Sequence, residues 1–382
     1  MIMAKILFIS NMAKKVGSFS VASIAAAQKC GLEFYFAANW SEASAEQIAA
    51  DEKKYNIKII CIDLARSPYS IQNIKAYKQL VDLIKKEHID YIHCNTPVGG
   101  MLGRLVGKKC KVKKVIYQVH GFHFYKGAQK KNWLVYYPIE KWLARKTDAI
   151  ITINKEDYER AKKFKLRNNG NVYYVPGVGI DLSNYEQNLA MREKKRDELK
   201  LKDSDLAIIS AGELNTNKNN KVIIEAIARL QKVNIHYYLC GKGPCEEQLK
   251  KLAQERNLDQ QIHFLGYRTD VGELLQASDI FVMPSYREGL SRSIMEAMAC
   301  GLPCIVSNIR GNSDLVQDDI GGYLLAPDDI NGFANAIQMF AQQPDLFVKM
   351  KYNNLKKIKN FSTNVVIKKL TNIYLDEFKE NQ

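Results

Sequence analysis

Apolar runs alternate with amphipathic segments along most of the chain. Short runs rich in β-branched and aromatic residues, such as 5–11 and 114–119, predict buried strands, whereas apolar positions spaced three to four apart, as in 71–87, predict helices. Strands that alternate with helices in this way form parallel sheets covered on both faces. The other elements expected in the first half are strands at 34–38, 57–62, 89–94, 149–154 and 172–175, and helices at 16–30, 98–108 and 133–145.

The alternation restarts after a polar, highly charged segment, 183–202, which we interpret as the domain boundary. Strands are expected there at 206–211, 235–240, 262–265, 280–283, 303–307 and 322–325, and helices at 219–230, 246–256, 271–276, 290–299, 314–316, 330–342 and 364–378. The sequence therefore predicts an α/β fold with two doubly wound, Rossmann-like domains that face a central cleft. We assign residues 1–180 with the C-terminal helix 364–382 to one domain and 181–363 to the other. Ligands of such sheets bind beyond the carboxyl ends of the strands.

The composition is that of a soluble globular protein with room for two cores. The chain has 382 residues, of which 46% are hydrophobic and 25% charged. It has no apolar run of about 18 residues, so no transmembrane helix is expected, and its first ten residues predict a strand rather than a signal peptide. Eight scattered cysteines without a CxxC pair argue against a disulfide framework or a zinc site, and favour reduced thiols in the cytosol.

The net charge of +15 lies in the first half. Residues 1–180 hold 30 Lys and Arg against 14 Asp and Glu, whereas residues 181–382 hold 26 against 27. Within 101–146, twelve basic residues face a single acid, Glu140. This concentration indicates an anionic partner. The segment 133–145 combines tryptophans with lysine and arginine, which suits an anionic membrane surface; a core helix with a basic outer face is the alternative.

Two carboxylates, Glu288 and Glu296, mark the segment SYREGLSRSIMEAMACG at 285–301. The pattern puts Glu288 on the loop that leaves a strand and Glu296 about two turns into the following helix. Among the small and apolar neighbours of Glu296 a carboxylate is costly to bury unless it is paired. The two residues are therefore either ordinary surface glutamates paired with a nearby Arg or Lys, or parts of a site.

Other candidate residues follow the predicted strands. Lys218, at the start of a helix, can bind phosphate as a point charge or can simply be solvated. Gly241 and Gly243 flank Lys242 in a strand-to-helix turn, where glycines either admit a phosphate or only allow the turn. His120 is placed to hydrogen-bond a hydroxyl in the cleft, or to pack within its loop.

The loop after the first strand argues against a dinucleotide site. It contains Gly17 as its only glycine and lacks the GxGxxG pattern that such sites use.

Together these segments resemble the retaining glycosyltransferases of family 4, which have the GT-B fold, and among them those that build bacterial capsule and exopolysaccharide. The resemblance covers nearly the whole chain. It is carried by HCNTPVGGMLGR (93–104), VHGFHFYKG (119–127), NWLVYYPIEKWLARKTDAIITINKEDY (132–158), GELNTNKN (212–219) and SYREGLSRSIMEAMACGLP (285–303). The specific feature is the eight-residue spacing of the two glutamates inside EGL…EAMACGLP.

The resemblance implies a nucleotide-sugar, which we expect to be a UDP-sugar, on the second domain. Glu288 would contact hydroxyls of the donor sugar, and Glu296 the ribose hydroxyls. The diphosphate would be held by Lys218 and by the backbone amides of Gly289 and Leu290.

The remaining roles implied by the resemblance fall on both domains. His120 would reach the donor sugar from the first domain, and Gly17 would lie near the diphosphate and the acceptor. Tyr267 and Arg268 lie where the base is usually held. One departure concerns Glu213, because many relatives have Arg there; Arg292 and Lys242 are candidates for the missing charge.

The implied reaction is transfer with retention of configuration. No residue is a convincing covalent nucleophile, so we expect the acceptor hydroxyl to attack on the same face that the leaving group departs from. We expect no metal or other cofactor. The leaving diphosphate would be stabilised electrostatically. We expect a polyprenyl-diphosphate-linked acceptor and a cytoplasmic enzyme that is peripheral on the inner face of the plasma membrane. The alternatives are a sugar-nucleotide epimerase of the same fold and a non-catalytic nucleic-acid-binding protein; we expect no nucleic acid as partner.

Overall fold

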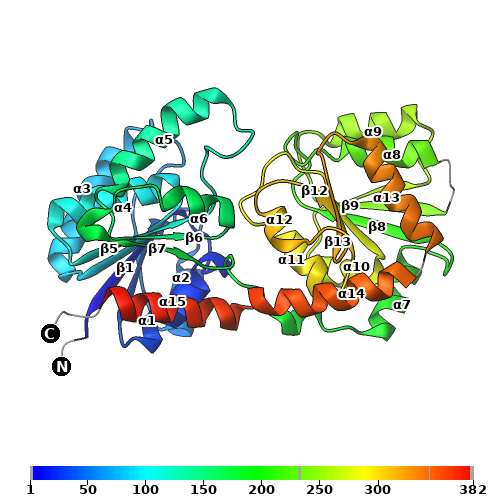
Figure 1. The fold of residues 1–382 in the computed structure, drawn as a ribbon. Helices are drawn as coiled ribbons and strands as arrows, with labels where there is room; N and C mark the ends of the chain where they lie inside the picture. The colour runs from blue at the N-terminus through cyan, green and yellow to red at the C-terminus, as the bar shows by residue number, and fades with distance from the viewer. Residues whose placement is uncertain (1–2, 231–233, 344, 379–382) are drawn as a thin grey trace. The chain divides into compact units, whose positions relative to one another are not determined.

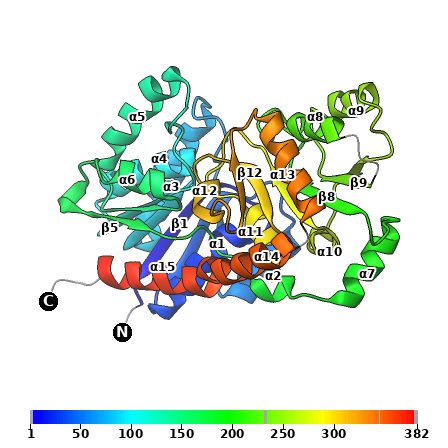
Figure 2. The same ribbon diagram turned by 45° about the vertical axis from the view of Figure 1, so that its right-hand side comes forward.

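The structure, a computed structural model, describes residues 3–230, 234–343 and 345–378, and it divides into two compact units (Figure 1). The first unit runs to Gly179 and resumes at Thr363, and the second spans Ile180–Ser362. Each unit is a parallel sheet with helices on both faces (Figures 1 and 2). The predicted pair of doubly wound α/β domains is therefore confirmed.

Seven strands form the first sheet, in the order β3-β2-β1-β4-β5-β6-β7. The order reverses between β1 and β4, which is the point where such sheets bind ligands. The strands are β1 (Lys5–Met12), β2 (Glu33–Asn39), β3 (Lys58–Cys61), β4 (Tyr91–Asn95), β5 (Lys114–Val119), β6 (Ala149–Thr152) and β7 (Asn171–Tyr174).

Helices cover both faces of the first sheet, each over its own hydrophobic core. Helix α4 can pack closely on β4 because Gly103 has no side chain. A Cβ at Gly103 would lie only 2.5 Å from the Cβ of Cys94. One face carries α1 (Ser18–Lys29), α2 (Ala45–Tyr55) and α15 (Thr363–Glu377). The other carries α3 (Gln72–Glu87), α4 (Pro97–Cys110), α5 (Lys130–Ala144) and α6 (Lys155–Ala161), and the 3₁₀ turn η1 (Arg167–Asn169) precedes β7.

Six strands form the second sheet, in the order β10-β9-β8-β11-β12-β13, so the order reverses between β8 and β11. The strands are β8 (Leu206–Ala211), β9 (Ile235–Cys240), β10 (Ile262–Gly266), β11 (Ile280–Met283), β12 (Cys304–Ser307) and β13 (Gly322–Leu325). The helical segments are η2 (Leu182–Tyr185), α7 (Leu189–Glu198), α8 (Lys221–Leu230), α9 (Glu246–Glu255), α10 (Val271–Ala277), α11 (Arg292–Ala299), α12 (Asn312–Leu315), α13 (Ile330–Gln342), α14 (Asp345–Ile358) and η3 (Lys359–Phe361).

Several elements differ from the sequence prediction. Helices α2, α6 and α14 were not predicted, and the expected linker 183–202 contains η2 and α7. Helix α7 is too polar to show an apolar stripe; what holds it is a set of ion pairs described below. Within the described ranges, no helix combines the length and the apolar character needed to cross a membrane.

A candidate active site at the carboxyl edge of the second sheet

Two charged side chains meet where the strand order of the second sheet reverses. Lys218 lies on the loop after β8, and Glu288 lies on the loop after β11. The Lys218 Nζ atom is 2.7 Å from Glu288 Oε1, and the two side chains are 22% and 14% exposed. The sequence predicted both residues for the site, and the structure brings them into direct contact. A lysine and a carboxylate at this point can bind an anion and a hydroxyl side by side.

The two loops are also joined through their backbones. The amide of Tyr286 donates to the carbonyl of Asn217 at 2.8 Å, and the Asn217 side chain donates to the carbonyl of Arg287 at 3.0 Å. Gly212 has a φ of +150°, and a Cβ there would lie 3.3 Å from Lys218 Cε. The lysine stem therefore passes close over a glycine, and its direction towards Glu288 is fixed locally.

A third loop supports Glu288 from behind. Arg310, on the loop after β12, is buried, and its Nε donates to the carbonyl of Glu288 at 3.2 Å. Gly311 has a φ of +82°, and a Cβ there would lie 2.3 Å from the carbonyl oxygen of Gly289. Sequence reasoning missed Arg310; the only signal was an arginine followed by a glycine in the loop after a strand. Gly289 and Leu290 therefore lie just before Ser291, the N-cap of α11, whereas the sequence predicted that the helix begins at 290.

Glu296 is in the second turn of α11, because the helix begins at Arg292 rather than at 290. Its Oε1 accepts from Arg292 Nε at 2.8 Å, and its side chain is 16% exposed. Tyr185 of η2 joins this pair: burial, followed by the charge of Glu296 and their hydrogen bond, raises the pKa of the phenol. The carboxylate is thus paired, as its position among apolar neighbours requires, and Arg292 lies beside it.

The glycines of the turn after β9 are required by backbone packing. A Cβ at Gly241 would lie 1.9 Å from the carbonyl oxygen of Gly212, and one at Gly243 would lie 2.4 Å from that of Leu214. The amide of Gly241 already donates to the carbonyl of Gly266 at 2.8 Å. The structure thus gives both residues a role in the turn, whatever they contact in a complex.

The residues expected near the base lie at the carboxyl end of the edge strand β10. Tyr267 is 77% exposed. The Arg268 guanidinium is committed to Asp270 and Glu198, at 2.5 and 2.8 Å, which raises the pKa of Arg268. Any contact of Arg268 with a base is therefore best made through its backbone.

Glu213, the position that departs from the family pattern, is exposed. The Glu213 side chain accepts from Asn215 Nδ2 at 2.8 Å, so it stays within its own loop. Lys242, on the neighbouring loop, is exposed and forms no ion pair with any described carboxylate. It remains a candidate for the missing charge together with Arg292.

In the first unit, Gly17 and His120 follow β1 and β5 at the carboxyl edge of that sheet. Gly17 is the N-cap of α1, and the Phe19 ring of α1 packs edge-on against His120, with centroids 5.0 Å apart. Both ring nitrogens of His120 are buried and have no partner among the described residues. Burial lowers the pKa of His120 to about 4, so the imidazole is neutral at neutral pH. A neutral imidazole can donate to or accept from a hydroxyl.

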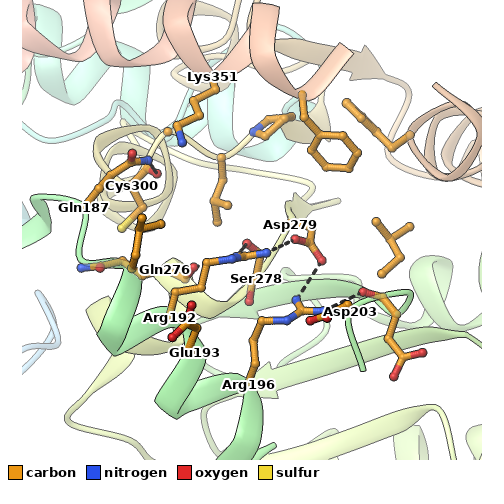
Figure 3. A pocket seen from close by; sticks show the side chains of 18 of the residues that line it. Gln187, Arg192, Glu193, Arg196, Asp203, Gln276, Ser278, Asp279, Cys300 and Lys351 are labelled. Carbon is orange, nitrogen blue, oxygen red and sulfur yellow. Dashed lines mark hydrogen bonds and ion pairs between the residues drawn. The ribbon is translucent and has the colours of Figure 1, made fainter. Parts of the chain in front are cut away.

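A pocket of about 640 Å³ lies at the opposite edge of the second sheet, where β8, β11 and β12 begin (Figure 3). Arg192 and Arg196 of α7 both contact Asp279 there, at 2.6 and 3.3 Å. Their remaining bonds go to main-chain carbonyls, including those of Ser278 and Asp205. The arginines thus fasten α7 to the sheet, which explains how so polar a helix is held.

Two family sequence models match this chain. The model described as "Glycosyl transferase 4-like" matches residues 6–154, and the model described as "Glycosyl transferases group 1" matches residues 191–357. The first match thus falls within the first unit and the second within the second unit.

Individual proteins agree with these matches. The chain is 33% identical over 375 residues to EpsD of Bacillus subtilis (strain 168), covering 97% of this chain and 96% of that protein. It is 31% identical over 318 residues to the Escherichia coli UDP-Gal:alpha-D-GlcNAc-diphosphoundecaprenol alpha-1,3-galactosyltransferase, covering 82% of each chain. The crystal structure of Anabaena Alr3699/HepE with UDP and glucose superposes with a TM-score of 0.79 at 18% identity, over 98% of this chain and 100% of that one, which shows a shared fold.

Proposed function

The chain belongs to the glycosyltransferases that pair a type 4-like domain with a group 1 domain in a GT-B fold, and we propose that it moves a sugar from a UDP-sugar to a polyprenyl-diphosphate-linked saccharide with retention of anomeric configuration. The product would extend a capsular or exopolysaccharide repeat unit. The observation that carries the proposal is the contact between Lys218 and Glu288 at the switch point of the second sheet. The E. coli relative, whose name includes a UDP-sugar and a diphosphoundecaprenol acceptor, supports the choice of substrates.

In this proposal the residues act by positioning and by electrostatics. Lys218 and the amides at the start of α11 stabilise the negative charge that develops on the leaving diphosphate. Glu288 holds a hydroxyl of the donor sugar beside them, and His120 offers a neutral imidazole to the same sugar. The acceptor oxygen bonds to the anomeric carbon on the face that the diphosphate leaves as the sugar–phosphate bond breaks, and the hydroxyl proton passes to the departing diphosphate oxygen, so the configuration is kept. No metal is needed for these roles.

A transfer assay tests the function. Purified protein is incubated with different UDP-sugars and a polyprenyl-diphosphate-linked monosaccharide, and the anomeric configuration of the product is read by NMR. We expect acceptor-dependent transfer with the donor's configuration, unaffected by EDTA. Donor epimerisation without acceptor would instead favour the epimerase. A product with inverted configuration would show that the proposed retention is wrong.

Substitution of Glu296 by alanine should abolish discrimination between UDP and 2′-deoxy-UDP. In the wild type the carboxylate would accept hydrogen bonds from the ribose hydroxyls, and bonds to a charged group contribute about 1.5–3 kcal/mol, or roughly a 10–100-fold difference in Kd. Calorimetric titration of both nucleotides measures this difference in Kd. The exposed Glu193 provides a matched control, since Glu193→Ala should keep the preference. If Glu296→Ala also kept the preference for UDP, the proposed contact between Glu296 and the ribose would be wrong.

Helix α5 gives the first unit a surface suited to an anionic membrane, and we propose that it holds the enzyme at the cytoplasmic face of the plasma membrane. Leu134, Val135, Ile139 and Trp142 are 77%, 43%, 43% and 51% exposed. Lys130 and Lys131 precede these residues and Lys141 lies between Ile139 and Trp142; all three lysines are exposed. A helix whose outer face mixes apolar and basic side chains favours the lipid interface.

Substitution of Leu134 by glutamate should weaken binding to vesicles that contain anionic phospholipid by at least about 10-fold. The change removes an apolar side chain worth about 1.5–3 kcal/mol when buried and adds a repelled charge. Vesicle sedimentation measures the bound fraction. Val348 on α14 of the second unit is 70% exposed and is the matched control, because Val348→Glu should leave binding unchanged. Equal effects of the two changes would rule out α5 as the contact.

A further inference from the structure

Glu288 lies between two peptide groups that are both held by side chains from other loops. The carbonyl of the peptide before its Cα, that of Arg287, accepts from Asn217 Nδ2 at 3.0 Å. The carbonyl of the peptide after its Cα, that of Glu288 itself, accepts from Arg310 Nε at 3.2 Å. Asn217 follows β8 and Arg310 follows β12, and these are the two strands that flank β11 in the sheet. The loop that carries Glu288 is therefore bonded to the loops of both neighbouring strands.

Two held peptides fix the direction of the side chain between them. Because a peptide group is planar, the backbone at Glu288 can rotate only about the two bonds that join its Cα to these peptides. Hydrogen bonds to both carbonyls restrict both rotations, and with them the direction of the Cα–Cβ bond. The carboxylate also contacts Lys218 at 2.7 Å. In the proposed complex Lys218 binds the diphosphate, so the two backbone bonds are the contacts that continue to direct the carboxylate.

The bond from Arg310 also orients an amide that is expected to hold the diphosphate. The Glu288 carbonyl and the Gly289 amide belong to one peptide, and in a trans peptide they point in opposite directions. The Gly289 N–H therefore points away from Arg310. Arg310 is only 8% exposed, and a planar guanidinium loses little freedom when it forms such a bond. One buried side chain thus sets the directions of the carboxylate and the amide together.

We propose that Asn217 and Arg310 are positioning residues that make the enzyme selective for its donor sugar, because they hold the Glu288 carboxylate against one hydroxyl of that sugar. This inference rests on the proposed function and deepens it, since it assigns the selectivity to two residues that do not touch the donor. A carboxylate that can move binds hydroxyls in several positions, whereas one held in place disfavours a donor that lacks the hydroxyl it faces.

Monodeoxy donors test the positioning role. The UDP-sugar that is active in the transfer assay is compared with its monodeoxy analogues, and the discrimination ratio is kcat/KM for the sugar divided by kcat/KM for the analogue. Both values come from one preparation, so the ratio does not depend on the fraction of enzyme that is folded. We expect the wild type to disfavour one analogue by about 10–100-fold, and Glu288→Ala to abolish this discrimination.

A pair of variants at Arg310 isolates the hydrogen bond. The side-chain nitrogen of glutamine is as many bonds from Cα as Nε is in arginine, so Arg310→Gln keeps a donor there, whereas Arg310→Met places a methyl group there. Both variants lose the charge and the terminal nitrogens. Arg310→Met should lower the discrimination ratio about 10-fold, and Arg310→Gln should keep it within about twofold. Asn217→Leu, which removes the other donor, should lower the ratio as Arg310→Met does.

Two bonds of the same kind elsewhere in the second unit provide matched controls. Arg192 donates to the carbonyl of Ser278 at 2.8 Å, at the opposite edge of the sheet (Figure 3). Asn353 of α14 donates to the carbonyl of Ile320 at 2.9 Å. Arg192→Met and Asn353→Leu should leave the discrimination ratio unchanged, even where thermal unfolding shows that they lower the stability.

The outcomes separate this inference from the proposed function. If Glu288→Ala kept the discrimination, the assignment of Glu288 to the donor sugar would fail, and the positioning role with it. If Glu288→Ala abolished the discrimination but Arg310→Met or Asn217→Leu kept it, the positioning role would be wrong while the proposed function would stand. An equal loss in Arg310→Gln and Arg310→Met, or a loss in Arg192→Met, would also contradict a role for the bond to the Glu288 carbonyl.

Discussion

Replacing Lys218 with methionine is expected to lower kcat for sugar transfer by about 10²–10³-fold, the size of effect seen when one preorganised group that stabilises developing charge is removed. The structure fixes the Lys218 ammonium at the switch point of the second sheet, 2.7 Å from Glu288. In the proposed mechanism it faces the leaving diphosphate, so its contribution grows as the sugar–phosphate bond breaks. Steady-state transfer with saturating donor measures the loss.

The partner of Lys218 should behave differently. Glu288→Gln keeps the size of the side chain but removes the charge, so the proposed contact with a sugar hydroxyl weakens while the lysine stays available for the diphosphate. Binding of UDP alone, which has no sugar, should then be retained in Glu288→Gln and weakened in Lys218→Met. If UDP binding fell equally in both variants, the assignment of the two residues to sugar and diphosphate would be wrong.

An exposed lysine in the first turn of α8 controls for the change in net charge. Lys221 lies three residues beyond Lys218, and among the described residues it forms no ion pair. Lys221→Met should therefore retain wild-type kcat. If it lost activity as Lys218→Met does, the effect would come from the general field of the loop rather than from the side chain at the switch point.

The sequence predicted the strands of both sheets well because a strand buried on both faces is an unbroken apolar run. Residues 280–283 are of this kind, and so are 304–306 before the polar Ser307; both strands, 280–283 and 304–307, have every residue buried. Helices that bury little were not predicted. In α2 the buried residue is Asp51, which accepts from the amide of Val16, so its position depends on a contact 35 residues away. No local pattern contains that information.

The same limit applies to the site. Lys218 and Glu288 could be predicted because a parallel sheet places every strand's carboxyl end on one edge, and the topology then brings the loops after β8 and β11 together. Arg310 could not be predicted, because it acts by donating a hydrogen bond to the carbonyl of Glu288. A bond from a side chain to a backbone carbonyl produces no recognisable sequence pattern. The pairing of Glu296 with Tyr185 also joins residues far apart in the chain. Its cause is tertiary packing of η2 against α11.

The ion pair that holds α5 in place is the other feature with a large expected effect. Arg104 of α4 is completely buried, and its guanidinium carbon lies 3.8 Å from the centroid of the Tyr117 ring. Its Nε donates to the carbonyl of Gly100 at 2.8 Å, and its two terminal nitrogens contact Glu140 of α5. The guanidinium is thus satisfied only when α5 supplies its carboxylate.

Replacing Glu140 with alanine should therefore destabilise the first unit by about 3–5 kcal/mol, because it leaves a buried charge without its partner. Denaturant unfolding with a probe in the first unit measures the change. Glu159→Ala, which breaks an exposed pair with Lys162, should cost less than about 1 kcal/mol. The double variant Arg104→Met with Glu140→Leu should recover most of the loss, since apolar residues that replace both partners of a buried pair are often neutral or stabilising. A double variant as unstable as Glu140→Ala would show that the carboxylate stabilises α5 by some contact other than the buried guanidinium.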